Sequence, residues 1–124
     1  MSASSERLFE RVFARADHPI FVLDPARDRI RYANRCACAL LGYDVGEILA
    51  MPITSLCGAE VPKLGAFLRA IDQRGDGWTI SLALRTKAGA FLPAEVLALC
   101  FVSDEHLYVL MLAHDRSQHR GRPG

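Results

Sequence analysis

The sequence predicts an α+β domain: a five-stranded antiparallel sheet with short helices on one face and an amphipathic helix at the N-terminus. Two short apolar runs that flank a turn open the main part of the chain, which is the pattern of a β-hairpin. Apolar residues then recur at helical spacing up to residue 74, and from residue 78 they alternate with period two, as in strands. Two strands early and three late favour one antiparallel sheet with the helices bunched on one face.

The composition fits a single globular domain. The chain has 124 residues, of which 51% are hydrophobic, and a formal net charge of +1. That length is typical of one domain, and a near-neutral charge gives no indication of nucleic-acid binding. No apolar run approaches the ~20 residues of a membrane helix, and the N-terminus lacks the apolar core of a secretory signal. We therefore expect no membrane span, no direct nucleic-acid contact and a cytoplasmic location.

Residues 1–17 are predicted to form an amphipathic cap helix. Charged residues separate the members of a narrow apolar stripe, which recur at helical spacing. The stripe consists of Leu8, Phe9, Val12 and Phe13. The helix should end before His18, because a residue that precedes proline avoids helical backbone angles.

The first hairpin joins an apolar strand at 20–23 to a second strand at 30–32. The unbroken apolar run of the first strand indicates burial on both faces. Asp24-Pro25 begins the turn between the strands, since both residue types favour turn conformations.

Two short helices and one long helix are expected after the hairpin. Asn34 is the expected N-cap of a helix over 35–41, which Gly42 ends. Asp44 is the expected N-cap of a second short helix. The longest helix is expected over 61–74, where apolar residues recur at helical spacing.

The C-terminal half predicts a three-strand meander. One face of its first strand carries Trp78, Ile80, Leu82 and Leu84. One face of the next strand carries Ala94, Val96, Ala98 and Cys100, and the other carries Glu95, Leu97, Leu99 and Phe101. The last strand is expected over 107–113. Residues 116–124 are expected to be a disordered tail or a linker, which leaves 18–115 as the core domain.

The last two strands are apolar on both faces, whereas an antiparallel sheet with one face in water should carry polar residues there. Something must therefore cover the second face. The stripe at Leu8, Phe9, Val12 and Phe13 is the natural cover, supplied by the same chain or by a partner. We predict a homodimer that forms through these four residues.

The stretch PIFVLDPARDRIRYANRCACALLGYDVGEILAMPI resembles the PAS domain. Members of this family pair an apolar strand that ends in Asp with a second strand that ends in Asn. A small-residue helix, a Gly-Tyr pair and a Glu-bearing turn follow. The matching residues are Asp24, Asn34, Gly42, Tyr43 and Glu47. The segment TKAGAFLPAEV resembles the family's later turn and strand, so the likeness covers roughly residues 7–116. Ala50 and Ala88 depart from the family, which often has Gly and Asp at these places.

The resemblance implies a sensory or interaction module that holds a small molecule, or no ligand, between sheet and helices. Family members dimerise and pass a conformational change to an attached or partner output domain, such as a kinase, a cyclase or a DNA-binding domain. We expect a sensory domain of a bacterial-type signal-transduction protein, such as a histidine kinase, or of a transcriptional regulator, and not an enzyme. Two alternatives are open: a ligand-free protein–protein interaction module, and a small α+β enzyme with Glu95 or Asp24 as base.

The cavity expected between sheet and helices would take a small apolar ligand. Its expected lining residues are Ile48, Leu68, Ile80, Leu82, Val96, Ala98 and Cys100. The identity of the ligand is left open. No covalent flavin adduct is expected, because Ile53 stands where flavin photosensors of the family carry their reactive cysteine, and Cys57 where they carry glutamine.

The cysteine pair in YANRCACALLGY does not predict a metal or haem site. On a helix, residues two apart lie about 200° around the axis, so Cys36 and Cys38 point away from each other. The cysteine spacings match neither zinc nor iron–sulfur patterns, and no CxxCH haem-attachment sequence is present. We expect no metal and cysteines that pack as small apolar side chains, with a redox role of Cys38 or Cys57 left open.

Overall fold

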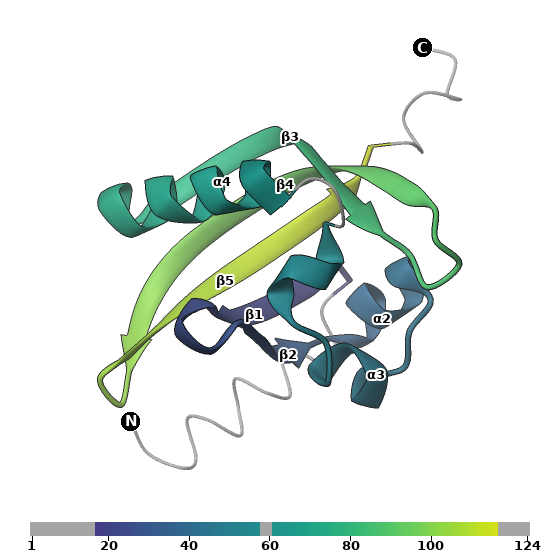
Figure 1. Ribbon diagram of the computed structural model, residues 1–124, viewed down its shortest axis with the longest axis horizontal. Helices are drawn as coiled ribbons and strands as arrows, with labels where there is room; N and C mark the ends of the chain where they lie inside the picture. Colours follow the sequence, from purple (N-terminus) through teal and green to yellow (C-terminus); the bar gives the residue numbers. More distant parts are fainter. Residues whose placement is uncertain (1–16, 58–60, 117–124) are drawn as a thin grey trace.

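The computed structural model describes residues 17–57 and 61–116, and within them five strands form one antiparallel sheet (Figure 1). The strand order is β2-β1-β5-β4-β3. The strands are β1 (Ile20–Asp24), β2 (Arg29–Ala33), β3 (Asp76–Arg85), β4 (Phe91–Ser103) and β5 (His106–Asp115). The predicted α+β class and the antiparallel five-stranded sheet are confirmed. The predicted cap helix lies outside the described residues except for residue 17, and the predicted tail except for Arg116.

The helices gather on one face of the sheet, in front of it in Figure 1. They are α2 (Arg35–Leu41), α3 (Val45–Leu49) and α4 (Val61–Arg74), with short 3-10 turns η1 (Pro25–Arg27) and η2 (Ile53–Leu56). Helix α4 packs mainly on β3, whereas α3 packs on β2 and α2 on β1. The N-terminal half of the chain therefore covers one end of the sheet and α4 the other.

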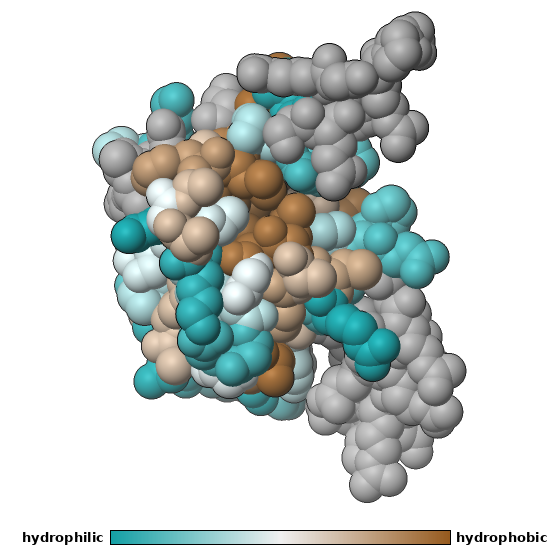
Figure 2. All heavy atoms as spheres, turned by 90° about the vertical axis from the view of Figure 1, so that its right-hand side faces the viewer, coloured by the Kyte–Doolittle hydropathy of each residue, from teal (hydrophilic) through white to brown (hydrophobic). Residues whose placement is uncertain are grey.

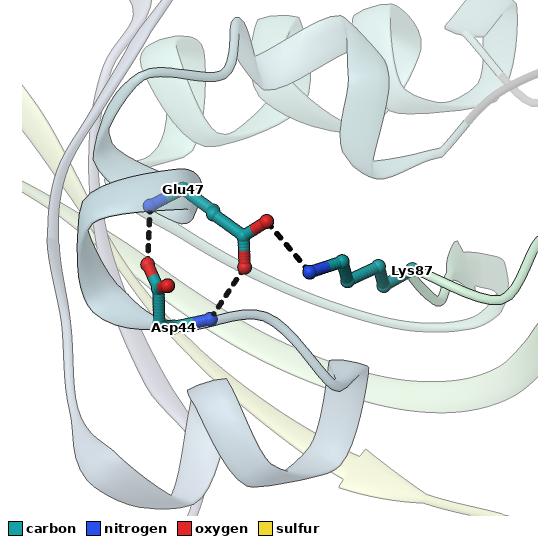
Figure 3. Close-up of polar contacts among 3 residues, drawn as sticks. All are labelled: Asp44, Glu47 and Lys87. Carbon is teal, nitrogen blue, oxygen red and sulfur yellow. Dashed lines mark hydrogen bonds and ion pairs between the residues drawn. The ribbon is translucent and has the colours of Figure 1, made fainter.

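The helix boundaries follow from the capping residues that the sequence shows. Asn34 accepts a hydrogen bond from the backbone N–H of Ala37 at 2.9 Å and starts α2. Gly42 ends this helix in the left-handed conformation, at a φ of 85°. Asp44 and Glu47 form a capping box at the start of α3, in which each side chain accepts from the other residue's backbone N–H (Figure 3).

The core lies between the sheet and the helices. The inward-facing side chains of β1 and β5 are buried, among them Phe21, Leu23 and Met111. From the helices, Leu41 and Ile71 are at most 1% exposed in the same cluster. Close packing of this kind leaves little tolerance for added volume.

Helix α4 approaches β3 most closely at Gly77. A Cβ atom at this position would lie 2.9 Å from Cγ1 of Ile71 and 3.0 Å from Cε1 of Phe67. Gly77 lies inside β3, opposite Ala98. The residue is glycine because a helix packs against the backbone at this point.

A β-bulge in β3 changes the predicted face of Ile80. Thr79 pairs with Val96 and Leu82 pairs with Ala94, so three steps along β3 match two along β4. The extra residue shifts the alternation by one. Leu82 is consequently 2% exposed in the core, whereas Ile80 is 42% exposed. The expectation that both share one face is wrong because strict alternation does not hold across a bulge.

The two central strands bring the ends of the described chain together. Strands β1 and β5 pair antiparallel, with Ile20 opposite Leu112. Beyond the start of β1, the backbone N–H of Ala113 donates to the carbonyl of Pro19 at 3.0 Å. The chain therefore enters the sheet next to the place where it leaves it.

Candidate functional site

The outer face of the sheet, away from the helices, is apolar as the sequence predicts. Trp78, Leu97 and Leu112 lie side by side across β3, β4 and β5, and Ile20 continues the row onto β1. In a second row, Leu99 faces Leu110. Trp78 is 56% exposed, and Leu97 and Leu99 are 47% and 45% exposed. These side chains form a continuous apolar surface instead of scattered exposed residues.

A groove of about 790 Å³ follows this outer face and reaches α4 at the β3 edge. Its lining residues are Ile20, Phe67, Ala70, Arg74, Asp76, Gly77, Trp78, Leu97, Ala98, Leu99, Leu110 and Leu112. Two charged residues, Arg74 and Asp76, border an otherwise apolar lining. Figure 2 shows hydrophobic side chains gathered at the surface on one side of the molecule, between hydrophilic ones. The groove suits an apolar partner such as one face of an amphipathic helix.

Polar contacts hold Trp78 at this surface. Its indole Nε1 donates to Oε2 of Glu95 at 2.7 Å. In the strand register, Glu95 lies opposite His114. The basic residue of the same strand as Trp78, Arg85, lies opposite Phe91 at the far end of β3. Glu95 therefore orients the indole that lines the groove.

The residues expected to line an inner cavity are mostly on the helix side of the sheet. Ile48, Leu82, Val96 and Ala98 belong to the core cluster, at 0%, 2%, 0% and 7% exposure. Leu68 and Cys100 pack against that cluster as partly buried residues. The Cys100 thiol lies 3.7 Å from the carbonyl oxygen of Ile71 on α4. These six residues therefore belong to the core between sheet and helices or pack against it.

Ile80 is the exception, since the bulge places it on the exposed outer face. The sequence carried no signal for this, because Ile80 and Leu82 are both apolar. The backbone carbonyl of Ile80 accepts from Arg116 Nη1 at 3.1 Å, which ties the end of the described chain to the bulge.

Asp24, one of the two acids considered as a base, is buried and held by a cation. It is 3% exposed, and its Oδ2 lies 2.8 Å from Nη1 of Arg27. The hydrogen bond with Asp24 raises the pKa of Arg27, and the Coulombic attraction of the same carboxylate adds to it. The other oxygen, Oδ1, is buried and makes no hydrogen bond within the described residues. The pair closes the turn after β1.

The cysteines do not form a reactive cluster. In the described part of the chain no group of three or more His, Cys, Asp and Glu side chains could hold a metal ion. Cys57 is 1% exposed. Burial raises the pKa of the Cys38 thiol, and Asp44 adds to the effect, so the nucleophilic thiolate is disfavoured there. Cys38 also packs against the core as a partly buried residue.

An ion pair links α3 to the β3–β4 hairpin (Figure 3). Lys87 Nζ lies 2.7 Å from Oε2 of Glu47, and the backbone N–H of Lys87 donates to the carbonyl of Leu41 at 2.8 Å. The Lys87 hydrogen bond lowers the pKa of Glu47, and backbone donation from Asp44 lowers it further. The Glu47 hydrogen bond raises the pKa of Lys87. The helices are thus fastened to the hairpin over the core.

Comparison with known proteins identifies this arrangement. The family model described as "PAS domain" matches residues 7–78, more than half of the chain. The chain belongs to the PAS domain family. The curated proteins include no match. The matched range includes the first hairpin and the caps of α2 and α3, which carry Asp24, Asn34, Gly42 and Glu47 of the sequence resemblance.

Solved PAS structures share the fold over almost the whole chain. A PAS domain from a two-component sensor histidine kinase superposes with a TM-score of 0.79 at 15% identity, covering 94% of this chain and 100% of its own. The PAS domain of an HTR-like protein from Haloarcula marismortui has a TM-score of 0.70 at 27% identity, with 90% and 91% coverage. A LOV protein from Rhodobacter sphaeroides has a TM-score of 0.79 at 18% identity, with 100% and 71% coverage.

Within the described ranges, none of the helices has the length and apolar character needed to cross a membrane. This agrees with the absence of a long apolar run in the sequence.

Proposed function

We propose that this PAS domain is a sensory module of a bacterial-type signal-transduction protein or transcriptional regulator, and that it acts by binding instead of catalysis. It would pass a conformational change to an attached or partner output domain, such as a kinase, a cyclase or a DNA-binding domain. Family membership and the likeness to a PAS domain of a sensor histidine kinase support the sensory role. The acids considered as catalytic bases are engaged elsewhere, Asp24 with Arg27 and Glu95 with Trp78.

The conformational change would be transmitted through a homodimer whose interface, the dimer seam, is the outer groove. The apolar outer face carries this proposal, because water-exposed rows of Leu and Trp favour a partner. The stripe at Leu8, Phe9, Val12 and Phe13 supplies matching apolar side chains. Full burial of one such side chain contributes ~1.5–3 kcal/mol. Eight of them in a two-fold dimer give roughly 12–24 kcal/mol, against an association cost of ~4–15 kcal/mol.

The test of the dimer is the mass in solution of the wild type and of a Phe9→Glu, Phe13→Glu double variant. We expect a dimer for the wild type and a monomer for the variant, because two carboxylates cannot be buried in the groove without charge partners. The matched control is Val45→Glu, Val102→Glu, since both valines are exposed and neither lines the groove. A monomeric wild type, or a variant that still dimerises, contradicts the dimer proposal.

The input would be a small apolar ligand held between sheet and helices. The supporting observation is the cluster of six predicted residues on the helix side, which includes the small side chains Ala98 and Cys100. Mass spectrometry of the purified protein after denaturation would reveal a colourless ligand, and an absorption spectrum a coloured one. A bound compound should be released in stoichiometric amount.

A ligand-free interaction module is the second candidate, and one observation favours it. Ile48, Leu82 and Val96 are at most 2% exposed within one contiguous core, as expected where side chains already fill the space. If denaturation releases no compound from protein purified from its native host, this second candidate replaces the ligand-binding proposal.

A further inference from the structure

Asn34 joins three parts of the fold through one buried side chain. It is 2% exposed. Its Oδ1 accepts from the backbone N–H of Ala37 at 2.9 Å and of Ile20 at 3.0 Å, and its Nδ2 donates to the carbonyl of His18 at 2.7 Å. The backbone N–H of Asn34 donates to the carbonyl of Ile20 at 3.0 Å. The residue thus links the start of α2, the end of β2 and the entrance to β1.

The segments that Asn34 links lead to opposite sides of the sheet. On the helix side, α2 places Ala37 and Leu41 in the core, at 0% and 1% exposure. On the other side, Ile20 lines the outer groove next to its β5 neighbour Leu112. The undescribed residues 1–16 join the fold at this end of the groove. Asn34 therefore connects the start of α2 to residues 18–20 by side-chain hydrogen bonds.

The hydrogen bond to His18 exceeds what a helix cap requires. An N-cap needs only an acceptor, so Asp and Ser cap a helix about as well as Asn. Among these side chains only the amide carries its acceptor and its donor on two separate atoms. The Nδ2 donation to His18 uses that donor to hold the chain before β1, which points to a role outside α2.

We propose that Asn34 is a positioning residue that couples α2 to the dimer seam in the outer groove. It holds residues 18–20 in place. It would thereby set the direction of the chain that precedes them, whose stripe at 8–13 binds the groove of a second copy. A shift of α2 caused by a ligand in the core would reach His18 and Ile20 through the two side-chain bonds. This inference rests on the proposed dimer and adds how its geometry is controlled.

The experiment compares the full-length wild type with Asn34→Asp and Asn34→Ser. Both variants keep an N-cap acceptor and lose the Nδ2–H group that donates to His18: Asp has an acceptor oxygen in its place, and Ser has one oxygen, which the cap uses. The control is Asp44→Asn, which changes the cap of α3, a helix that packs mainly on β2. One readout is the dimer dissociation constant from sedimentation. The other is acrylamide quenching of Trp78, which is the single tryptophan of the sequence and lines the groove. Urea unfolding verifies that each variant is folded.

We expect both Asn34 variants to raise the dissociation constant about five- to tenfold, the equivalent of one net hydrogen bond. Quenching of Trp78 should increase in parallel, and Asp44→Asn should change neither readout. Folded Asn34 variants with wild-type dissociation constant and quenching would show that Asn34 is only a cap. An equal effect of Asp44→Asn would show that general loss of stability is the cause, and would also overturn the inference.

A monomeric wild type would remove the proposed dimer but would still test Asn34 through Trp78. Increased quenching in both Asn34 variants, and not in Asp44→Asn, would retain the positioning role for a segment that covers the groove of its own chain. Unchanged quenching would overturn it.

Discussion

Gly77→Ala should destabilise the domain by forcing α4 away from β3. The added Cβ would lie 2.9 Å from Cγ1 of Ile71, which is ~0.5 Å inside the 3.4 Å at which ordinary contact begins. Ile71 is fully buried and β3 is hydrogen-bonded to β4, so neither side can move freely. Gly77 is not among the residues with positive φ, so alanine adds no backbone strain there.

The expected magnitude combines two opposing effects. Adding a methyl group to a packed interface costs ~1–3 kcal/mol. Replacing a glycine inside a strand by alanine offsets ~0.5–1 kcal/mol through backbone entropy. The free energy of unfolding should therefore fall, by up to about 2.5 kcal/mol, which lowers Tm by about 4–8 °C for each kcal/mol in a domain of this size.

Urea unfolding followed by circular dichroism measures this difference. The matched control is Gly46→Ala in α3, where a Cβ would meet only Oδ1 of Asp44 at 3.4 Å. This variant should be as stable as the wild type or up to ~1 kcal/mol more stable, because alanine is the better helix former. A Gly77→Ala variant at least as stable as the wild type would refute the argument that glycine is required for the contact between α4 and β3.

Two further predictions concern the sheet faces and the ion pair. Leu82→Ala should lower the free energy of unfolding by ~2–5 kcal/mol, as truncation of a buried side chain does. Ile80→Ala should change it by only ~0.5 kcal/mol, because this side chain is exposed. Similar urea midpoints for the two variants would contradict the position of the bulge. Because the folded-state pKa of Glu47 is lowered, the ion pair stabilises the fold above the ordinary glutamate pKa of about 4.3 and this stabilisation is lost as pH falls through the folded-state value. Lys87→Met should accordingly have a lower free energy of unfolding than the wild type at pH 7, and this difference should become smaller below about pH 4.3 and in high salt. A difference in free energy that does not depend on pH would show that packing, not charge, is responsible.

Local sequence signals account for most of the fold. Asn34, Gly42 and Asp44 define the helix boundaries because capping depends on one side chain and its neighbouring backbone. The meander was predictable because its apolar residues alternate. The apolar outer face was predictable too, since Leu97 and Leu99 are separated by residues that the core requires.

The remaining features depend on tertiary contacts that no local pattern reports. The bulge before Leu82 could not be predicted from the sequence, because Ile80 and Leu82 are both apolar and either fits either face of the sheet. The role of Gly77 could not be read from the sequence. A glycine so close to Gly75 is typical of a turn, but a glycine also occurs where a helix packs closely against a strand. The partner of Glu95 was missed because Trp78 lies 17 positions away in sequence and comes close only through the register of β3 and β4.

The pairing of β1 with β5 determines how such a domain fits into a longer polypeptide. Neighbouring strands lie about 5 Å apart, so linkers on the two sides of the domain start almost from one point, as Ala113 and Pro19 do. A unit with this geometry can be inserted into a helical stalk, or repeated along one, with little change in the path of the stalk. Two helices that continued from these ends would be near enough to pack against each other.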